Sequence, residues 1–215
     1  MSYTLYIVGT PIGNLEDVSL RCLRILSDVS LIAAEDTRVT RKLLSRYDIH
    51  TSLTSFNQRN WKGKLPKLLE ALKTADIALV TDAGTPNISD PGHELTTGAV
   101  LDGAQLSVIP GPSALTAAVS LSVLPSGRFI FIGFLPRRTT QRQRSLMELS
   151  DQRIPIVVFE SPHRLLACMK DILSTLGDRP ITVCRELTKV HEEVYRGTVS
   201  EALRHFSHPR GEFTL

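Results

Sequence analysis

The alternation of short apolar runs with amphipathic stretches along the first 120 residues constrains the fold most. Between the apolar runs, Leu20, Leu23 and Leu26 lie at helical spacing, as do Leu65 and Leu72. Strands that alternate with helices predict an α/β fold with a parallel sheet covered on both faces. The expected strands are 4–8, 31–34, 77–80 and 106–109, with a weaker one at 52–55.

The second half of the chain predicts a separate domain. Pro125 and Gly127 favour a boundary there, which divides 1–123 from 124–215. The run at 193–195 has no preceding crossover helix, so antiparallel pairs and a mixed sheet are expected. Residues 211–215 resemble the start of a strand, and we expect this domain to be truncated at its last strand. The other expected elements are strands at 129–132, 156–159 and 181–184, an Arg-rich helix, and helices at 163–176 and 200–206.

Composition indicates a globular, cytoplasmic protein. Hydrophobic residues make up 42% and charged residues 22% of the chain, both close to the globular average. The three cysteines are widely spaced and fit neither a disulfide framework nor a metal site, which favours a reducing compartment. We expect no signal peptide, no membrane span and no metal.

Two basic tracts stand out although the net charge is only +3. Residues 38–67 hold eight basic side chains and a single acid, Asp48, and residues 137–144 hold four arginines and no acid. Such tracts either bind phosphate groups or form solvated helix faces, and the sequence leaves both open. The candidates for a phosphate-facing surface are Arg38, Arg41, Lys42, Arg59, Lys62, Lys64, Arg137, Arg138, Arg142 and Arg144.

Four loops rich in glycine, proline and small polar residues follow expected strands. They are 9–15 (GTPIGNL), 35–38 (EDTR), 81–92 (TDAGTPNISDPG) and 110–114 (PGPSA). None is a GxGxxG or P-loop motif, which argues against a Rossmann dehydrogenase. Each loop alone could be a simple turn, but four of them at the carboxyl ends of parallel strands predict a binding crevice.

These motifs, followed in order by GFLP, FESPHRL and CRELTK, closely resemble the ribosomal RNA small subunit methyltransferase I family of the tetrapyrrole methylases. The resemblance runs from Leu5 to Leu215. It implies two α/β domains with S-adenosylmethionine in the cleft between them, and a homodimer. It also implies methylation of the 2′-oxygen of a decoding-centre cytidine in 16S ribosomal RNA, free or in the small subunit, which gives the basic tracts an RNA partner.

The resemblance also implies the positions that bind the cofactor. The second domain is expected to contribute two of them, Phe159 and Glu160. The full set is Ile12, Asp82, Ala83, Gly84, Thr85, Ser113, Ala114, Phe159 and Glu160.

Catalysis is expected to depend mainly on alignment, with a carboxylate taking the hydroxyl proton. The candidates are Glu35, Asp36 and Glu160. Pairing with Arg38 would lower the pKa of a neighbouring carboxylate and weaken it as a base. Purely structural roles for all three remain open, as do a tetrapyrrole acceptor and a non-catalytic RNA-binding module.

Overall fold

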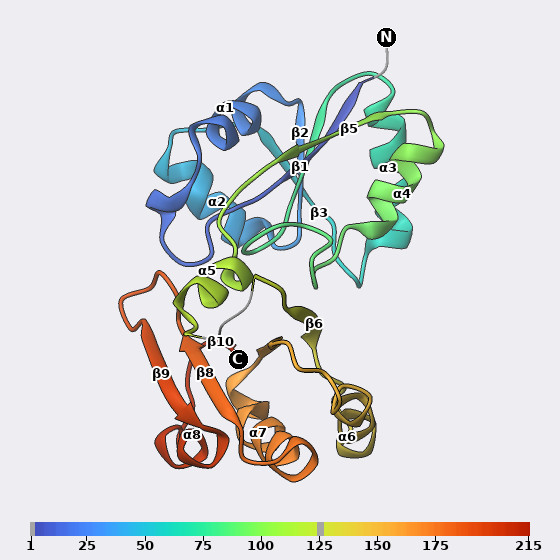
Figure 1. Cartoon of the computed structure of the whole chain (residues 1–215). Helices are drawn as coiled ribbons and strands as arrows, with labels where there is room; N and C mark the ends of the chain where they lie inside the picture. The colour runs from blue at the N-terminus through green and yellow to red at the C-terminus, as the bar shows by residue number, and fades with distance from the viewer. Residues whose placement is uncertain (1–2, 124–126) are drawn as a thin grey trace. The chain divides into compact units, whose positions relative to one another are not determined.

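The structure is a computed structural model that describes residues 3–123 and 127–215. It divides into two compact units, Met1–Ser113 and Ala114–Leu215 (Figure 1). The sequence predicted the boundary ten residues later, between 123 and 124, and Leu124–Ser126 lie outside the described residues. Helix α5 (Ala114–Leu121) therefore groups with the second unit, where it packs against the last strand.

The first unit contains a five-stranded parallel sheet, as predicted. Its order is β3-β2-β4-β1-β5, so the first strand lies near one edge, between the fourth and the fifth. In register, Leu5 lies opposite both Ile77 and Leu106. The strands are β1 (Thr4–Val8), β2 (Leu31–Ala34), β3 (Ser52–Ser55), β4 (Ile77–Val80) and β5 (Gln105–Ile109).

Helices cover both faces of this sheet because successive strand residues point in opposite directions. Val8, Ile32 and Ala78 face a core formed with α1 and α2, whereas Leu5 and Leu79 face a core formed with α3 and α4. The helices are α1 (Leu20–Asp28), α2 (Thr37–Arg46), α3 (Trp61–Leu72) and α4 (His93–Leu101), with a 3-10 turn at Leu15–Asp17.

The second unit contains a mixed sheet, which confirms the predicted antiparallel pairs. Its order is β6-β7-β10-β8-β9, in which only β6 and β7 pair in parallel. The two-residue strand β10 (Phe213–Thr214) lies between β7 and β8 and pairs with both. The other strands are β6 (Ile130–Phe134), β7 (Ile156–Glu160), β8 (Pro180–Arg185) and β9 (Glu193–Thr198).

Besides α5, the core of this unit is formed with helices α6 (Thr139–Met147), α7 (Pro162–Leu176) and α8 (Val199–His205). The long helix α7 lies between the other two and buries Leu165, Cys168 and Met169 completely. A capping box between Thr198 and Glu201 begins α8. In the described part of the chain, no helix combines the length and the apolar character needed to cross a membrane.

Candidate active site

Backbone hydrogen bonds join the loop after β1 to the loop after β4. The Thr10 N–H donates to the Gly84 carbonyl at 2.8 Å, and the Gly84 N–H returns a bond to the Thr10 carbonyl at 3.1 Å. The Thr10 hydroxyl also donates to the Thr81 carbonyl at 3.2 Å. Ile12 lies against the same turn, because a Cβ built on Gly84 would be 3.9 Å from its Cγ2 atom. Hydrogen bonds therefore join the first predicted loop (9–15) directly to the third (81–92).

The loops after β1 and β5 meet backbone to backbone. The Gly9 N–H donates to the Ile109 carbonyl at 2.9 Å. A Cβ on Gly9 would lie 2.7 Å from the Gly111 nitrogen, and a Cβ on Gly111 would lie 2.6 Å from the Gly9 oxygen. Only glycine at both positions permits this approach. The fourth predicted loop is thereby held against the first.

Carboxylates join the loop after β2 to the loop after β4. The Asp36 N–H donates to Oδ1 of Asp82 at 3.0 Å, and the Asp82 N–H donates to Oε2 of Glu35 at 3.3 Å. All four predicted loops therefore meet at the carboxyl edge of the parallel sheet. The helices that follow the adjacent strands β1 and β4 pack on opposite faces, which is the arrangement in which open α/β sheets bind ligands.

The carboxylates at this edge titrate differently from one another. Burial raises the pKa of Glu35 and of Asp82. Burial, together with the negative charge of Glu35, raises the pKa of Asp90 to about 7. Hydrogen bonds from Arg38 lower the pKa of Asp36 to about 2. The edge therefore holds one carboxylate that stays ionised and one that exchanges a proton near neutral pH.

The loop 81–92 also carries unusual backbone angles. Gly84 has φ +76°, and Asn87 and Ser89 have φ +73° and +61°, a region that residues other than glycine rarely adopt. The buried Oδ1 atom of Asn87 has no hydrogen-bond partner among the described residues. Strained backbone and an unsatisfied buried acceptor are typical of a functional loop.

Comparisons with known proteins agree with this architecture. The family model of the tetrapyrrole (corrin/porphyrin) methylases matches residues 4–203. A Thermotoga maritima protein named ribosomal RNA small subunit methyltransferase I is 50% identical over 98% of this chain and 96% of its own length. A Bacillus subtilis protein of the same name is 43% identical over 98% of this chain and 73% of its own. The chain belongs to the ribosomal RNA small subunit methyltransferase I family.

Solved structures show the same fold at low sequence identity. A cobalt precorrin-4 methyltransferase has a TM-score of 0.72 at 18% identity, covering 98% of this chain and 93% of its own. Uroporphyrin-III C-methyltransferase from Thermus thermophilus has a TM-score of 0.71 at 18% identity, covering 98% and 96%. The chain is thus a two-domain tetrapyrrole methylase-like methyltransferase, an enzyme that uses S-adenosylmethionine.

Two of the methyltransferase's predicted cofactor residues end β7 in the second unit. Phe159 packs edge-on against Phe131, with ring centroids 4.9 Å apart. Glu160 is 2% exposed, accepts a hydrogen bond from the Ser161 N–H at 2.8 Å, and lies 3.2 Å from Nη2 of Arg164. The pairing with Arg164 matches the structural alternative that the sequence left open. A cofactor role for either residue stays a prediction.

The first basic tract is divided between two helices. Arg38, Arg41 and Lys42 lie exposed on α2, whereas Lys62 and Lys64 lie on α3, which packs on the opposite face of the sheet (Figure 1). Arg38 pairs with Asp36, and Nζ of Lys64 donates to the Thr54 hydroxyl at 3.0 Å. Arg59 is exposed just before α3. The basic residues of this tract therefore lie on helices on both faces of the sheet, before and after the edge strand β3 in the sequence. They do not form one continuous helix face.

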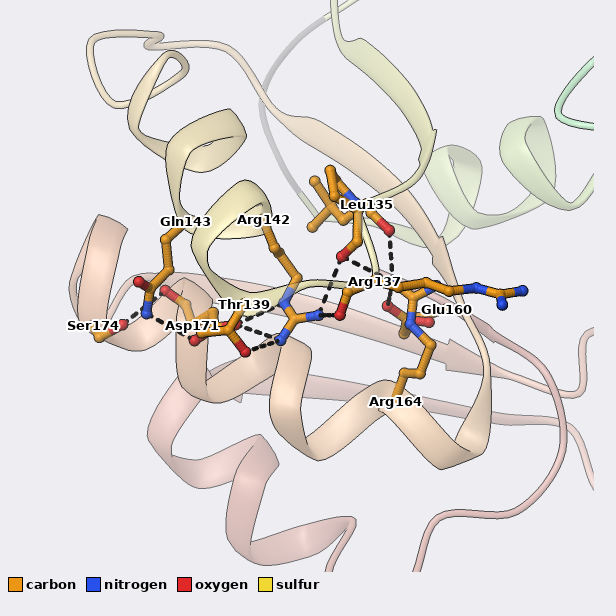
Figure 2. Close-up of polar contacts among 10 residues, drawn as sticks. Leu135, Arg137, Thr139, Arg142, Gln143, Glu160, Arg164, Asp171 and Ser174 are labelled. Carbon is orange, nitrogen blue, oxygen red and sulfur yellow. Dashed lines mark hydrogen bonds and ion pairs between the residues drawn. The ribbon is translucent and has the colours of Figure 1, made fainter.

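The expectation that Arg142 faces RNA is wrong. Arg142 is 2% exposed, and its guanidinium pairs with Asp171 of α7 (Figure 2). The exposed arginines of this second tract are Arg137, Arg138 and Arg144, and Arg144 pairs with Glu148. An arginine-rich run resembles a solvated face in sequence, but one of its members points into the core.

Several other polar and aromatic side chains that could serve chemistry or RNA binding have surroundings that the structure describes. His163 is exposed in the first turn of α7, and the half-buried Trp61 packs against the core beneath α3. Arg185 pairs with Glu193, and Lys189 pairs with Glu186 and Glu212. Over the described residues, no group of three or more His, Cys, Asp or Glu side chains could hold a metal.

Asp90 was not among the carboxylates predicted from the sequence as a base, and its raised pKa was missed. The signal was present in the SDPG segment, which places a carboxylate among turn residues beside the EDTR loop. The shift comes first from burial and then from the negative charge of Glu35, which is 55 residues earlier in the chain, and neither can be read from the local sequence.

Proposed function

We propose that this enzyme transfers a methyl group from S-adenosylmethionine to the 2′-oxygen of a decoding-centre cytidine in 16S ribosomal RNA. The observation that carries the proposal is the sheet edge at which all four loops meet, in a chain half identical to a ribosomal RNA small subunit methyltransferase I. The two exposed basic regions, on α2 and just before α6, suit a polyanion better than a tetrapyrrole.

The residues at the edge fit the cofactor. S-adenosylmethionine carries a positive sulfonium and an ammonium group, and Glu35, Asp82 and Asp90 supply negative charge at this edge. Gly84 brings backbone close to the crevice, and Oδ1 of Asn87 is a buried acceptor that an N–H donor would satisfy. Asp82–Thr85, Ile12 and Ser113–Ala114 would hold the cofactor, with Phe159 and Glu160 as proposed contacts from the second domain.

The cofactor supplies an activated methyl group, so the protein needs to align the ribose and accept one proton. Among the original candidates, Glu35 fits that role best because burial raises its pKa. Asp36 is a poor base because Arg38 stabilises its ionised form, and Glu160 is buried beside Arg164. Asp90 joins Glu35 as a candidate because its pKa of about 7 lets it take up a proton at neutral pH.

We further propose that the enzyme acts in the cytoplasm as a homodimer without a metal. The three cysteines are free and buried, which suits a reducing compartment. The RNA-facing candidates that remain are Arg38, Arg41, Lys42, Arg59, Lys62, Lys64, Arg137, Arg138 and Arg144.

Transfer of labelled methyl from S-adenosylmethionine tests the acceptor class directly. Unmethylated 16S RNA, isolated small subunits and uroporphyrinogen III are offered in parallel. The proposal expects labelled RNA and an unlabelled tetrapyrrole. Label on the tetrapyrrole alone would favour the competing acceptor. Cofactor binding without transfer to any acceptor would favour a non-catalytic RNA-binding module.

A further inference from the structure

We propose that Arg142 and Arg164 are positioning residues that fix the backbone of residues 135–137, so that the exposed Arg137 and Arg138 are presented to RNA phosphates in a set orientation. The inference rests on the proposed function, because it assumes an RNA substrate. It gives a different role to Arg142, which the sequence placed among the RNA-facing candidates, and a role to Arg164 of the FESPHRL motif.

Arg142 donates hydrogen bonds to the backbone of the loop 135–138. Its Nη1 donates to the carbonyls of Pro136 at 3.2 Å and of Arg137 at 3.1 Å, and its Nη2 donates to the Thr139 hydroxyl at 3.3 Å (Figure 2). Its Nε donates to Oδ2 of Asp171 at 2.6 Å. The planar guanidinium thus serves an ion pair and two loop carbonyls at once, which a lysine ammonium at that position would not reproduce.

Arg164 holds the preceding residues. Its Nη2 donates to the Leu135 carbonyl at 2.5 Å and more weakly to the Pro136 carbonyl at 3.4 Å. The same atom lies 3.2 Å from Oε2 of Glu160. Three consecutive carbonyls, those of residues 135–137, therefore point toward two cationic side chains from α6 and α7 (Figure 2).

Each of the two arginines pairs with its own buried carboxylate. Asp171 is 7% exposed and also accepts a hydrogen bond from Gln143 at 2.9 Å, while the Glu160 side chain is fully buried. The two positive charges are thus neutralised locally and do not themselves serve a polyanion. Such charge-assisted bonds are stronger than neutral ones and hold a loop firmly.

The side chains of Arg137 and Arg138 are available to bind RNA phosphates. Arg137 and Arg138 are exposed, and neither side chain has a hydrogen-bond or ion-pair partner in the described ranges 3–123 and 127–215. A loop that is already ordered loses less conformational entropy when it binds. The arginines of this run therefore have two different roles. Arg142 orders the loop backbone, and Arg137 and Arg138 bind the RNA phosphates.

A double-mutant cycle on RNA affinity tests this division of roles. The four proteins are the unaltered enzyme, Arg142→Lys, the double variant Arg137→Ala/Arg138→Ala, and the triple variant. The probe is 16S RNA, titrated over a range of salt concentrations. We expect Arg142→Lys to weaken binding by about tenfold, or ~1.4 kcal/mol. The slope of the logarithm of the binding constant against the logarithm of salt concentration should become less negative. The expected change is about 0.7–0.9 for each phosphate that the variant no longer neutralises.

In the Arg137→Ala/Arg138→Ala background, the same Arg142→Lys change should have no further effect on RNA affinity, because the side chains it positions are gone. Equal weakening in both backgrounds would overturn the inference. So would a lowered Tm with unchanged RNA affinity, or unchanged affinity in Arg137→Ala/Arg138→Ala. Failure of the unaltered protein to bind RNA would instead contradict the proposed function itself.

Arg196→Lys is the matched control. Nη2 of Arg196 also donates to a backbone carbonyl, that of Leu121 at 2.6 Å, but outside the 135–138 loop, so RNA affinity should stay unchanged. If Arg142→Lys does not fold, Arg164→Lys replaces it in the same cycle, because the Arg164 side chain is 23% exposed and tolerates change better. The expected and contradicting results are the same for that variant.

Discussion

Replacement of Gly9 by alanine should loosen the meeting point of the loops after β1 and β5. The new Cβ would lie 2.7 Å from the nitrogen and 2.9 Å from the Cα of Gly111, and 3.3 Å from the Ile109 carbonyl. All three atoms belong to backbone and cannot rotate away, so one loop has to move. Overpacking of this kind costs about 1–3 kcal/mol. For a chain of this size, each kcal/mol lowers the Tm by roughly 2–4 °C.

Urea unfolding and calorimetric titration with S-adenosylmethionine measure the two consequences of this change. Gly9→Ala should unfold at lower urea and bind the cofactor more weakly, because the displaced loop belongs to the proposed site. Gly63→Ala is the control: it lies in α3, where the new Cβ would meet nothing within 4 Å beyond its chain neighbours and its own helix backbone, and it should stabilise by up to about 1 kcal/mol. Unchanged stability and affinity in Gly9→Ala would show that this close approach does not hold the two loops together.

Three further predictions concern single sites. Gly84→Val should abolish cofactor binding while unfolding stays cooperative, because φ +76° is strained for a β-branched residue; calorimetry decides. Arg142→Ala should cost about 3–5 kcal/mol in urea unfolding by leaving Asp171 buried and unpaired, against less than ~1 kcal/mol for the exposed Arg144→Ala. The raised Asp90 pKa means that the folded state holds its proton more tightly than the unfolded state, so stability should fall from pH 4 to 7; Asp90→Asn should flatten that fall.

The sequence predicted most strands closely because their apolar runs are short and end at polar or turn-forming residues, such as Gly9 after β1, Glu35 after β2 and Thr81 after β4. The spans of β1, β2, β3 and β4 are as predicted, and β6 starts one residue late and ends two residues late. The four loops were expected at one edge, and hydrogen bonds join them there. The strand order was not predictable, because it depends on contacts between segments far apart in the chain.

Long-range partners also explain where sequence reasoning failed. The burial of Arg142 depends on Asp171, 29 residues later and on another helix. The grouping of α5 with the second unit depends on its packing against β10, close to the end of the chain. Local composition carries no signal for either contact. The cofactor contacts of Phe159 and Glu160 stay predictions, because they come from the family resemblance and no contact within the chain tests them.

The identity of the nucleoside that receives the methyl group decides whether the proposed reaction is correct. Small-subunit RNA treated with the enzyme and labelled S-adenosylmethionine is digested to nucleosides and analysed by mass spectrometry. We expect one labelled product, 2′-O-methylcytidine, from the decoding region. A base-methylated nucleoside, or label spread over many positions, would contradict the proposal.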